Sequence, residues 1–368
     1  MSSTVESVDV AAEAAAPEQP ERLPFIEGVR GLAALVVVLG HCINSCGYLF
    51  RWPGQQMVYL FLVVSGFSLA YSEDVRRSRG RQTSVGEFTL RRVWRILPTY
   101  YVALGFGLLV LLSVPRHLLA GVPSLAPLGL TWGGQLSHLV LLHNLHGRWL
   151  YQDNGPLWSI AYEAQAYLFF PLLYAASKRL EPALVAGAAI CANLAVRHFE
   201  PTFQFGGLLG WFALGIALAL LYRSPSLRRI PTGVLLLLST TALVAALAGK
   251  GRLATVNANG LCWAVVFGCA LLAMTRRPAS PVNPANAAPL RWLGVRSYSL
   301  YALHFPVLWS VYAVAAGLQQ EQRLLVMLAV AVPLSVLAAW AGYLAVEKPS
   351  LRRVRAVGTS VRSAPSRR

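Results

Sequence analysis

Long apolar stretches separated by short polar segments fill most of this 368-residue chain. A helix needs about 20 apolar residues to cross the hydrocarbon core of a bilayer, and ten stretches come close to that length. Their ranges are 29–49, 55–72, 93–114, 156–176, 182–198, 204–222, 230–249, 256–275, 297–317 and 323–345. The pattern predicts an all-α fold, a membrane bundle of about ten transmembrane helices.

Three parts of the chain lie outside this pattern. Residues 1–22 are rich in alanine and acidic residues, and residues 351–368 are polar and basic. We expect both tails to be disordered, which leaves residues 23–350 as one membrane domain. The long connection 115–155 contains the run LSHLVLLHNL, which is too short to cross a bilayer. It predicts a re-entrant or interfacial segment.

The composition favours the same class of protein. Hydrophobic residues make up 56% of the chain and charged residues 13%, whereas soluble domains carry about a quarter charged residues. The mean hydropathy is +0.52. A water-soluble protein of this size is therefore excluded. The five cysteines lie in apolar stretches and imply no disulfide framework.

The positive charge gives an orientation. The net charge is +17, but the basic residues form short runs between apolar stretches, so we expect no nucleic-acid partner. With ten spans, 25 of the 32 Lys and Arg residues fall on the side that holds both termini. Cytoplasmic loops carry the excess of positive charge. We therefore expect a multi-pass protein of the cytoplasmic membrane with both termini in the cytoplasm.

Arg30 and His41 stand at the two ends of one predicted span, RGLAALVVVLGH. On a helix they lie about 16 Å apart along the axis and on nearly the same face. Histidine is the side chain best suited to accept a proton near neutral pH. The alternative is a buried histidine that only bridges two helices.

Glu163 lies in LWSIAYEAQAYLFFP, near the outer end of another predicted span. A carboxylate there needs a hydrogen-bond donor or a water-filled cavity, and Tyr162 and Gln165 are candidate donors. The alternative is an acid that packs helices together by pairing with an arginine.

The segment LRRVWRILPTYY contains Arg91, Arg92 and Arg95, of which the last two are one turn apart. Arginine forks match phosphate oxygens, so the cluster is a candidate anion site. The alternative is that these side chains only anchor the helix at the membrane surface.

Two histidine groups carry weaker signals. His304 shares a face with Tyr298 and Tyr301 in SYSLYALHFPVLW, and we interpret this polar stripe as structural. His143 and His146 have the spacing of two metal ligands, but no third ligand accompanies them. We therefore expect an interfacial pair and no metal site.

Together, these stretches resemble the motifs of the acyltransferase 3 family of membrane acyltransferases, in family order from residue 25 to about 350. The residues that carry the resemblance are Arg30 and His41; Ser65, Gly66 and Phe67; Arg92 and Arg95; Trp158, Ser159, Glu163, Gln165, Tyr167 and Pro171; Ser297, Tyr298, Tyr301 and His304; and Glu347 and Pro349. Departures are Glu27 for the usual Asp, Ala164 for a second Glu, and Ala345 and Val346 before the closing Glu.

The resemblance implies transfer of an acyl group from acyl-CoA, such as acetyl-CoA, to a hydroxyl of a carbohydrate, a surface polysaccharide or a macrolide-type natural product. CoA would be a substrate, and no permanently bound cofactor is expected. His41 would be the general base and Glu163 a further catalytic residue, with Arg30, Arg92 and Arg95 on the CoA phosphates. Backbone N–H groups near Ser65 and Gly66 are candidate donors to the oxyanion. The expected pocket residues are Trp158, Ser159, Gln165, Tyr298, His304 and Glu347.

Two other functions remain open. A transporter or flippase for a glycan or small molecule would have a similar number of spans and buried polar residues, although the two related halves that are common in transporters are not evident. A structural subunit would not need Arg30, His41 and Glu163 together.

Overall fold

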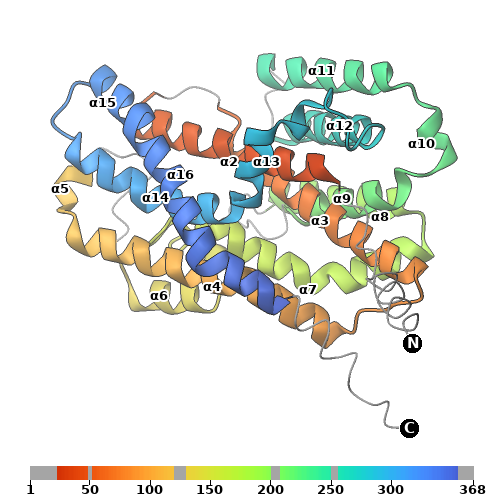
Figure 1. Cartoon of the computed structure of the whole chain (residues 1–368), viewed down its shortest axis with the longest axis horizontal. Helices are drawn as coiled ribbons and strands as arrows, with labels where there is room; N and C mark the ends of the chain where they lie inside the picture. The colour runs from red at the N-terminus through yellow and green to blue at the C-terminus, as the bar shows by residue number, and fades with distance from the viewer. Residues whose placement is uncertain (1–22, 49–51, 120–129, 200–207, 250–255, 355–368) are drawn as a thin grey trace, which may run out of the picture.

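The computed structural model describes residues 23–48, 52–119, 130–199, 208–249 and 256–354, and all regular structure in these ranges is helical (Figure 1). The predicted disorder of residues 1–22 and 355–368 falls outside the described residues. Residues 351–354 are helical, so the last helix continues past the expected domain boundary at 350.

The first half of the chain contributes the helices that carry most of the predicted site. They are α2 (Pro24–Ser45), α3 (Gly54–Ser78), α4 (Val85–Ser113), α5 (Arg116–Leu119), α6 (Trp132–Leu139), η2 (His143–Leu145), α7 (Leu157–Arg179) and α8 (Pro182–Phe199). The second half contributes α9 (Leu209–Leu221), α10 (Pro225–Arg229), α11 (Thr232–Ala248), α12 (Val256–Thr275), η4 (Pro284–Asn286), α13 (Ala288–Val295), α14 (Ser297–Val314), α15 (Gln320–Val326), η5 (Met327–Ala331), α16 (Val332–Gly342) and η6 (Tyr343–Glu347).

Four helices in the described ranges are long and apolar enough to cross a membrane: Pro24–Ser45, Gly54–Ser78, Val85–Ser113 and Gln320–Val354. Shorter apolar helices cover Pro182–Val196, Leu209–Leu221, Thr232–Ala248 and Asn259–Thr275. These lengths support a multi-pass membrane protein. The count of ten spans and the cytoplasmic position of both termini stay predictions.

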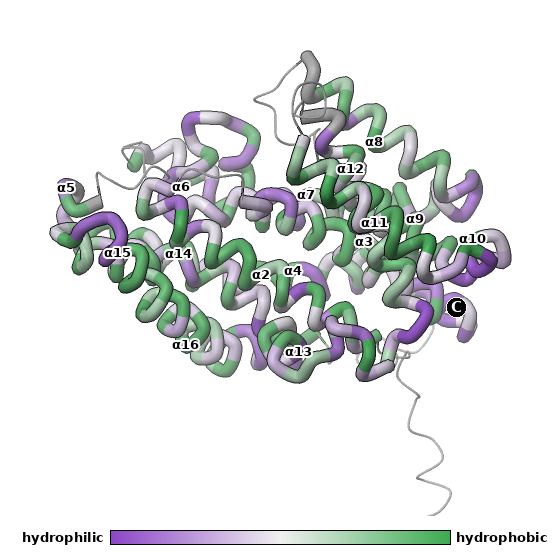
Figure 2. The backbone as a smooth tube through the Cα atoms, turned by 90° about the horizontal axis from the view of Figure 1, so that it is seen from above, coloured by the Kyte–Doolittle hydropathy of each residue, from purple (hydrophilic) through white to green (hydrophobic). Residues whose placement is uncertain are grey.

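The surface of the bundle has the character that lipid requires. Large apolar side chains are exposed on its helices, among them Leu112 (71% exposed), Leu168 (71%) and Leu237 (66%). Hydrophilic segments gather around α10 at one end and around α5, α6 and α15 at the other, while the helices between are mostly hydrophobic (Figures 1 and 2). Exposed apolar surface on this scale favours contact with lipid over contact with water.

Glycine allows a close helix contact in the core, between α3 and α9. A Cβ atom on Gly66 would lie 2.1 Å from the carbonyl oxygen of Phe212, and one on Gly215 would lie 2.0 Å from that of Val63. Small residues let the backbones of membrane helices approach closely. This contact fixes the middle of α3, where Ser65 belongs to the predicted site.

Helix α4 begins at Val85, eight residues before the predicted start at 93. Ser84 caps the helix by accepting a hydrogen bond from the backbone N–H of Glu87 at 3.1 Å. A serine followed three residues later by glutamate is a known start signal, and the hydrophobicity pattern alone misses it. Arg91, Arg92 and Arg95 therefore lie within a rigid helix.

The last helix runs without a break from Gln320 to Val354, but its turns at η5 and η6 are π-helical. Such turns often occur at functional positions. The second one ends at Glu347, which belongs to the site.

Candidate active site

The three arginines of the predicted donor site lie around one cavity of about 170 Å³. Arg30 comes from α2, Arg92 and Arg95 come from α4, and residues of α3 and α7 complete the wall. Arg76 and Arg91 also line this space, so five guanidinium groups surround it. We call it the arginine cavity. Such a concentration of cations suits a polyanionic ligand.

The three arginines of the predicted donor site differ in how fully their charge is compensated. Arg95 pairs with Glu347 at 3.2 Å, and Arg30 Nε donates to Ser297 Oγ at 3.3 Å. The Arg92 guanidinium lies over the rings of Phe88 and Tyr167, 5.6 and 5.4 Å from their centroids. Rings and hydroxyls compensate a cation less completely than a carboxylate does, so Arg30 and Arg92 keep more capacity to bind an added anion than Arg95 does.

Glu347 fixes Arg95 from the far end of the chain. Its carboxylate is 1% exposed and accepts hydrogen bonds from the backbone N–H and hydroxyl of Ser299, at 3.2 and 2.6 Å. Glu347 therefore joins α14, α4 and the π turn η6 at one point.

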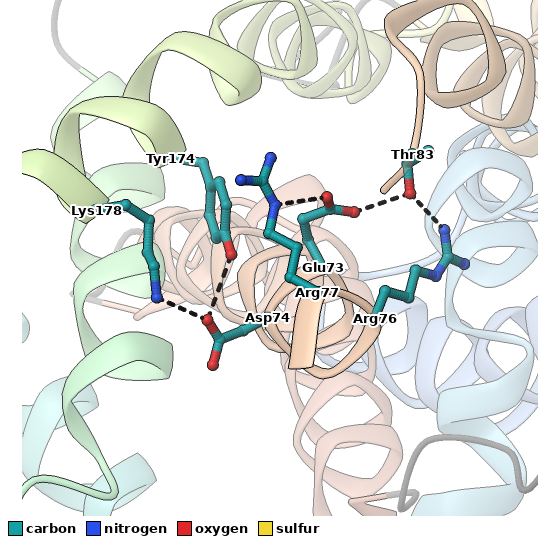
Figure 3. Close-up of polar contacts among 7 residues, drawn as sticks. All are labelled: Glu73, Asp74, Arg76, Arg77, Thr83, Tyr174 and Lys178. Carbon is teal, nitrogen blue, oxygen red and sulfur yellow. Dashed lines mark hydrogen bonds and ion pairs between the residues drawn. The ribbon is translucent and has the colours of Figure 1, made fainter. Parts of the chain in front are cut away.

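The rim of the arginine cavity is a network of charged residues at the end of α3 (Figure 3). Glu73 accepts from Arg77 at 3.0 Å and from the Thr83 hydroxyl at 2.8 Å, and Thr83 in turn accepts from Arg76 at 2.9 Å. These bonds tie α3 to the segment that leads into α4.

A second pair of bonds ties α3 to α7 beside this network (Figure 3). Asp74 accepts from Lys178 at 3.0 Å and from Tyr174 at 3.4 Å. Both groups of bonds hold the mouth of the arginine cavity in place.

Glu163 lies deeper in the bundle, between α7 and α3. It accepts a hydrogen bond from Ser65 Oγ at 2.5 Å and another from the Tyr167 hydroxyl. The prediction that Gln165 donates to Glu163 is wrong, because its Nε2 donates to Leu141 O at 2.7 Å and to Asn144 Oδ1 at 2.8 Å. Tyr167 is on the same face of α7 as Glu163, four residues on, whereas Gln165 is two residues on and points elsewhere.

A second, smaller cavity of about 30 Å³ lies next to Glu163. Its wall includes Ser159, Tyr298 and Tyr301, together with apolar side chains of α3. Arg30 lines both this cavity and the arginine cavity, so the two spaces share a wall residue.

His41 and His304 lie together beyond the small cavity. Their ring centroids are 5.3 Å apart, and the ring of Phe305 lies 4.9 Å from that of His41. Tyr301, which lines the small cavity, has its ring 5.9 Å from His304. His304 was interpreted as structural from its position and as a pocket residue from the resemblance; its place against His41 follows only from the packing of α14.

A proline accounts for part of this geometry. Pro306 in α14 has no N–H to give to the carbonyl of Ala302. Asn154, from the connection before α7, supplies the missing donor at 2.8 Å and also donates to Ala103 O at 3.3 Å. The connection is thereby held against the histidine pair, and Gly155 contacts the ring of Phe305.

The other predicted pocket residues fall into three groups. Ser159 and Tyr301 share a hydrogen bond of 2.7 Å across the small cavity, and Tyr298 donates to Ile96 O at 2.8 Å. Trp158 packs against the apolar core. Gln165 lines neither of the two cavities and instead clamps the outer connection to α7.

The expectation that backbone N–H groups near Ser65 and Gly66 bind an oxyanion is not supported. Both residues lie in the interior of α3, where backbone N–H groups already donate to carbonyls four residues earlier. The Ser65 hydroxyl donates to Glu163 instead.

His143 and His146, the alternative metal pair, point to different partners. His143 stacks on His138 at 3.7 Å between centroids, and His146 stacks on Trp149 at 4.5 Å. Burial, followed by the neighbouring His138, lowers the pKa of His143 to about 3. No cluster of three or more metal-ligating side chains occurs within the described ranges.

Several side chains that complete the site were not singled out as site residues. Tyr167 and Tyr301 sit within motifs noticed in the sequence; Tyr167 donates to Glu163 on its own helix, and Tyr301 pairs with Ser159 of α7. Ser299, Phe305 and Phe61 carry no signal in the sequence alone. The packing of α14 against α2, α4 and α16 brings Ser299 and Phe305 to the site, and Phe61 lines the small cavity from α3.

These features define a membrane-embedded helical bundle with a row of polar side chains, here called the polar path, which runs from the arginine cavity past Arg30 and Tyr301 to the pair His304 and His41. A family model that describes an acyltransferase domain, acyltransferase 3, matches residues 23–344. The chain therefore belongs to the acyltransferase 3 family and carries a membrane acyltransferase domain.

Three curated proteins illustrate the range of its relatives. Peptidoglycan O-acetyltransferase OatA of Listeria monocytogenes is 25% identical over 78% of this chain and 49% of its own length. Acyltransferase MdmB of Streptomyces mycarofaciens is 25% identical over 79% of this chain and 80% of its own length. The putative membrane-bound transacylase BcsY of Komagataeibacter xylinus is 29% identical, over 76% and 72%.

The chain spans about half the length of OatA and of the putative peptidoglycan O-acetyltransferase YrhL of Bacillus subtilis. No solved structure matches the chain.

Proposed function

We propose that the protein transfers an acyl group, acetyl or another short acyl, from acyl-CoA to a hydroxyl of a carbohydrate or of a glycosylated natural product such as a macrolide. The observation that carries this proposal is the order of the side chains: the two cavities share Arg30, and Tyr301 in the wall of the smaller one lies 5.9 Å from His304, which lies beside His41. The family supplies the class of reaction, and the site residues suggest how it proceeds.

The donor fits the arginine cavity by charge and by shape. CoA is polyanionic at one end and carries a thin, flexible arm that ends in the thioester. Arg92 and Arg30 can bind phosphate oxygens, while Arg95, fixed by Glu347, adds to the positive electrostatic potential of the cavity. The thin arm then passes Arg30 into the small cavity, beside Glu163 and Tyr301.

The acceptor reaches the other end of this path. His41 takes the proton from the acceptor hydroxyl as the oxygen attacks the thioester carbonyl carbon. The tetrahedral intermediate expels the CoA thiolate as the carbon–sulfur bond breaks, and the thiolate recovers the proton from His41. General-base assistance of this kind contributes about 10²–10⁴-fold to the rate.

Glu163 suits a positioning role in this scheme. Its carboxylate lies next to Arg30 in the small cavity and is held by Ser65 and Tyr167. Because those two donors fix the carboxylate, Glu163 can orient the arm of the donor as it passes from one cavity to the other.

The test is purified protein in proteoliposomes with radiolabelled acetyl-CoA and a panel of hydroxyl acceptors that includes a peptidoglycan fragment, a cellulose oligosaccharide and a macrolide. We expect thiol release that depends on an acceptor, and an acylated product identified by mass spectrometry. Acceptor movement across the bilayer without any ester product would overturn the proposal and favour a transporter.

A further inference from the structure

The ring of His304 carries its proton on one identifiable nitrogen. His304 is 0% exposed. Its Nδ1 lies 2.8 Å from the carbonyl oxygen of Tyr301 and 3.2 Å from that of Leu300. A carbonyl oxygen only accepts hydrogen bonds. Nδ1 must therefore hold the hydrogen, and this leaves Nε2 of the neutral ring with a bare lone pair.

That lone pair has no partner among the described residues. Nε2 of His304 is fully buried and makes no hydrogen bond there. A buried acceptor left without a donor costs free energy that a structure seldom tolerates without a functional reason. The atom is thus available for a group that belongs to the reaction.

The nearest imidazole ring that can donate a hydrogen bond to Nε2 is that of His41. Two imidazole rings joined by one N–H···N bond have centroids about 5 Å apart, and the observed separation is 5.3 Å with the planes tilted by 37°. Phe305 restricts the His41 ring from a second side, at 4.9 Å. Hydrogen bonds between catalytic groups are often long before substrate binds and shorten in the complex.

We propose that His304 is the positioning residue of His41. Nε2 of His304 accepts the N–H of His41, which selects the tautomer whose other nitrogen is bare and faces the acceptor hydroxyl. When His41 takes the proton, the same bond stabilises the imidazolium, and no proton passes to His304. Asp or Glu fills this place in other acyl-transfer sites; here a neutral imidazole does so within a membrane bundle.

This inference rests on the proposed function, because it assumes that His41 is the base. It competes with a purely structural role for His304, in which only the Nδ1–H bond to the α14 backbone matters. Two substitutions separate these roles. Asn places its amide near the position of Nδ1, whereas Gln places its amide near that of Nε2.

The experiment compares His304→Gln and His304→Asn in proteoliposomes, with kcat and both KM values measured for acetyl-CoA and an acceptor. We expect Gln to keep kcat within about 10-fold of the unaltered protein and Asn to lower it by about 10²-fold, with both KM values unchanged. Thermal unfolding in detergent serves to verify that each variant is folded. An Asn variant as active as the unaltered protein would overturn the inference.

A double variant tests whether His304 acts through His41. If it does, His304→Asn adds no further loss in the His41→Ala background. A loss that multiplies would show that His304 acts by another route and would overturn the inference. Full activity of His41→Ala alone would overturn the proposed base instead, and the inference with it.

A spectroscopic measurement avoids the question of folding in variants. In protein labelled with ¹⁵N-histidine, we expect His304 to appear as the Nδ1–H tautomer and to show a coupling across the N–H···N bond to His41 once donor and acceptor analogues are bound. An Nε2–H tautomer for His304 would overturn the inference.

Discussion

The two ends of the polar path use opposite chemistry. At the arginine end, positive side chains are stabilised by neighbouring groups: Arg95 pairs with Glu347, and Arg92 lies over two aromatic rings. At the histidine end, the neighbours of His41 are a second imidazole and the ring of Phe305. One end is suited to hold an anion, and the other is suited to move a proton.

The difference follows from what each end must do within a membrane. A charge moved out of water costs several kcal/mol unless it is paired, so a site for phosphates needs a fixed counter-charge such as Glu347. A proton acceptor works best when its neighbours are neutral and its ring is fixed. In the proposed function, donor binding and proton transfer are therefore separated along the path. Variants at the two ends should affect different kinetic constants.

The largest effect is expected at the histidine end. His41→Ala removes the base and should lower kcat by about 10²–10⁴-fold. The KM for acetyl-CoA should change little, because Arg30, Arg92 and Arg95 keep their contacts. The measurement is acceptor-dependent thiol release in proteoliposomes over a range of donor concentrations.

The matched control for His41→Ala is Leu237→Ala on α11. Leu237 is 66% exposed on the outer surface of the bundle and touches neither cavity, so its variant should behave as the unaltered protein. A His41→Ala enzyme with an unchanged kcat would remove the distinction between the two ends.

The next effect is on stability, at the arginine end. Glu347→Ala leaves Arg95 and the Ser299 donors without their acceptor. Breaking a buried ion pair by removing one partner costs about 3–5 kcal/mol, so the thermal midpoint in detergent should fall clearly.

Glu347→Gln is the informative companion to that variant. It keeps an acceptor for Ser299 but loses the charge, and we expect a smaller loss of stability. Equal midpoints for the Ala variant and the unaltered protein would mean that the pair does not hold α4 to α14.

A smaller effect is expected on donor affinity. Arg92→Ala should raise the KM for acetyl-CoA by about 10–100-fold, the equivalent of one hydrogen bond to a charged group, with kcat nearly unchanged. Arg92→Lys should recover part of this loss, because lysine keeps the charge but not the fork. Arg229→Ala, an exposed arginine on α10, is the control and should leave the KM as it is.

The sequence predicted one end of the path better than the other. Spacing and charge indicated an anion site at Arg92 and Arg95, the resemblance to the acyltransferase 3 family added Arg30 as a donor residue, and all three line one cavity. These arginines could be noticed because charged residues within apolar spans are rare and their function is constrained.

The histidine pair could not be predicted in the same way. His41 and His304 are 263 residues apart in the chain, and only the packing of α14 on α2 brings them together. Ser65 was missed as a partner of Glu163 for a related reason, since it comes from another helix. Helical periodicity shows which face a residue occupies but not which helix that face meets.

The smallest effect concerns Asp153, which lies in the connection held near the histidine end and is 2% exposed. Burial raises the pKa of its carboxyl to about 7. Between about pH 4 and pH 7 the folded protein then keeps a proton that the unfolded chain has released, so stability falls as the pH rises through this range and is constant above it. Asp153→Asn should raise the thermal midpoint at pH 8 by roughly 2–8 °C and leave it unchanged near pH 4.

The slope of this pH profile tests the contrast between the two ends. If Asp153 is neutral below pH 7, the connection that Asn154 ties to α14 contains no buried anion there, in keeping with the neutral neighbours of His41. The Asn variant should then lose the fall in stability between pH 4 and 7. A variant whose profile stays parallel to that of the unaltered protein would mean that the carboxyl is ionised in the fold. The histidine end would then contain a buried anion, and the opposite chemistry of the two ends would have to be abandoned.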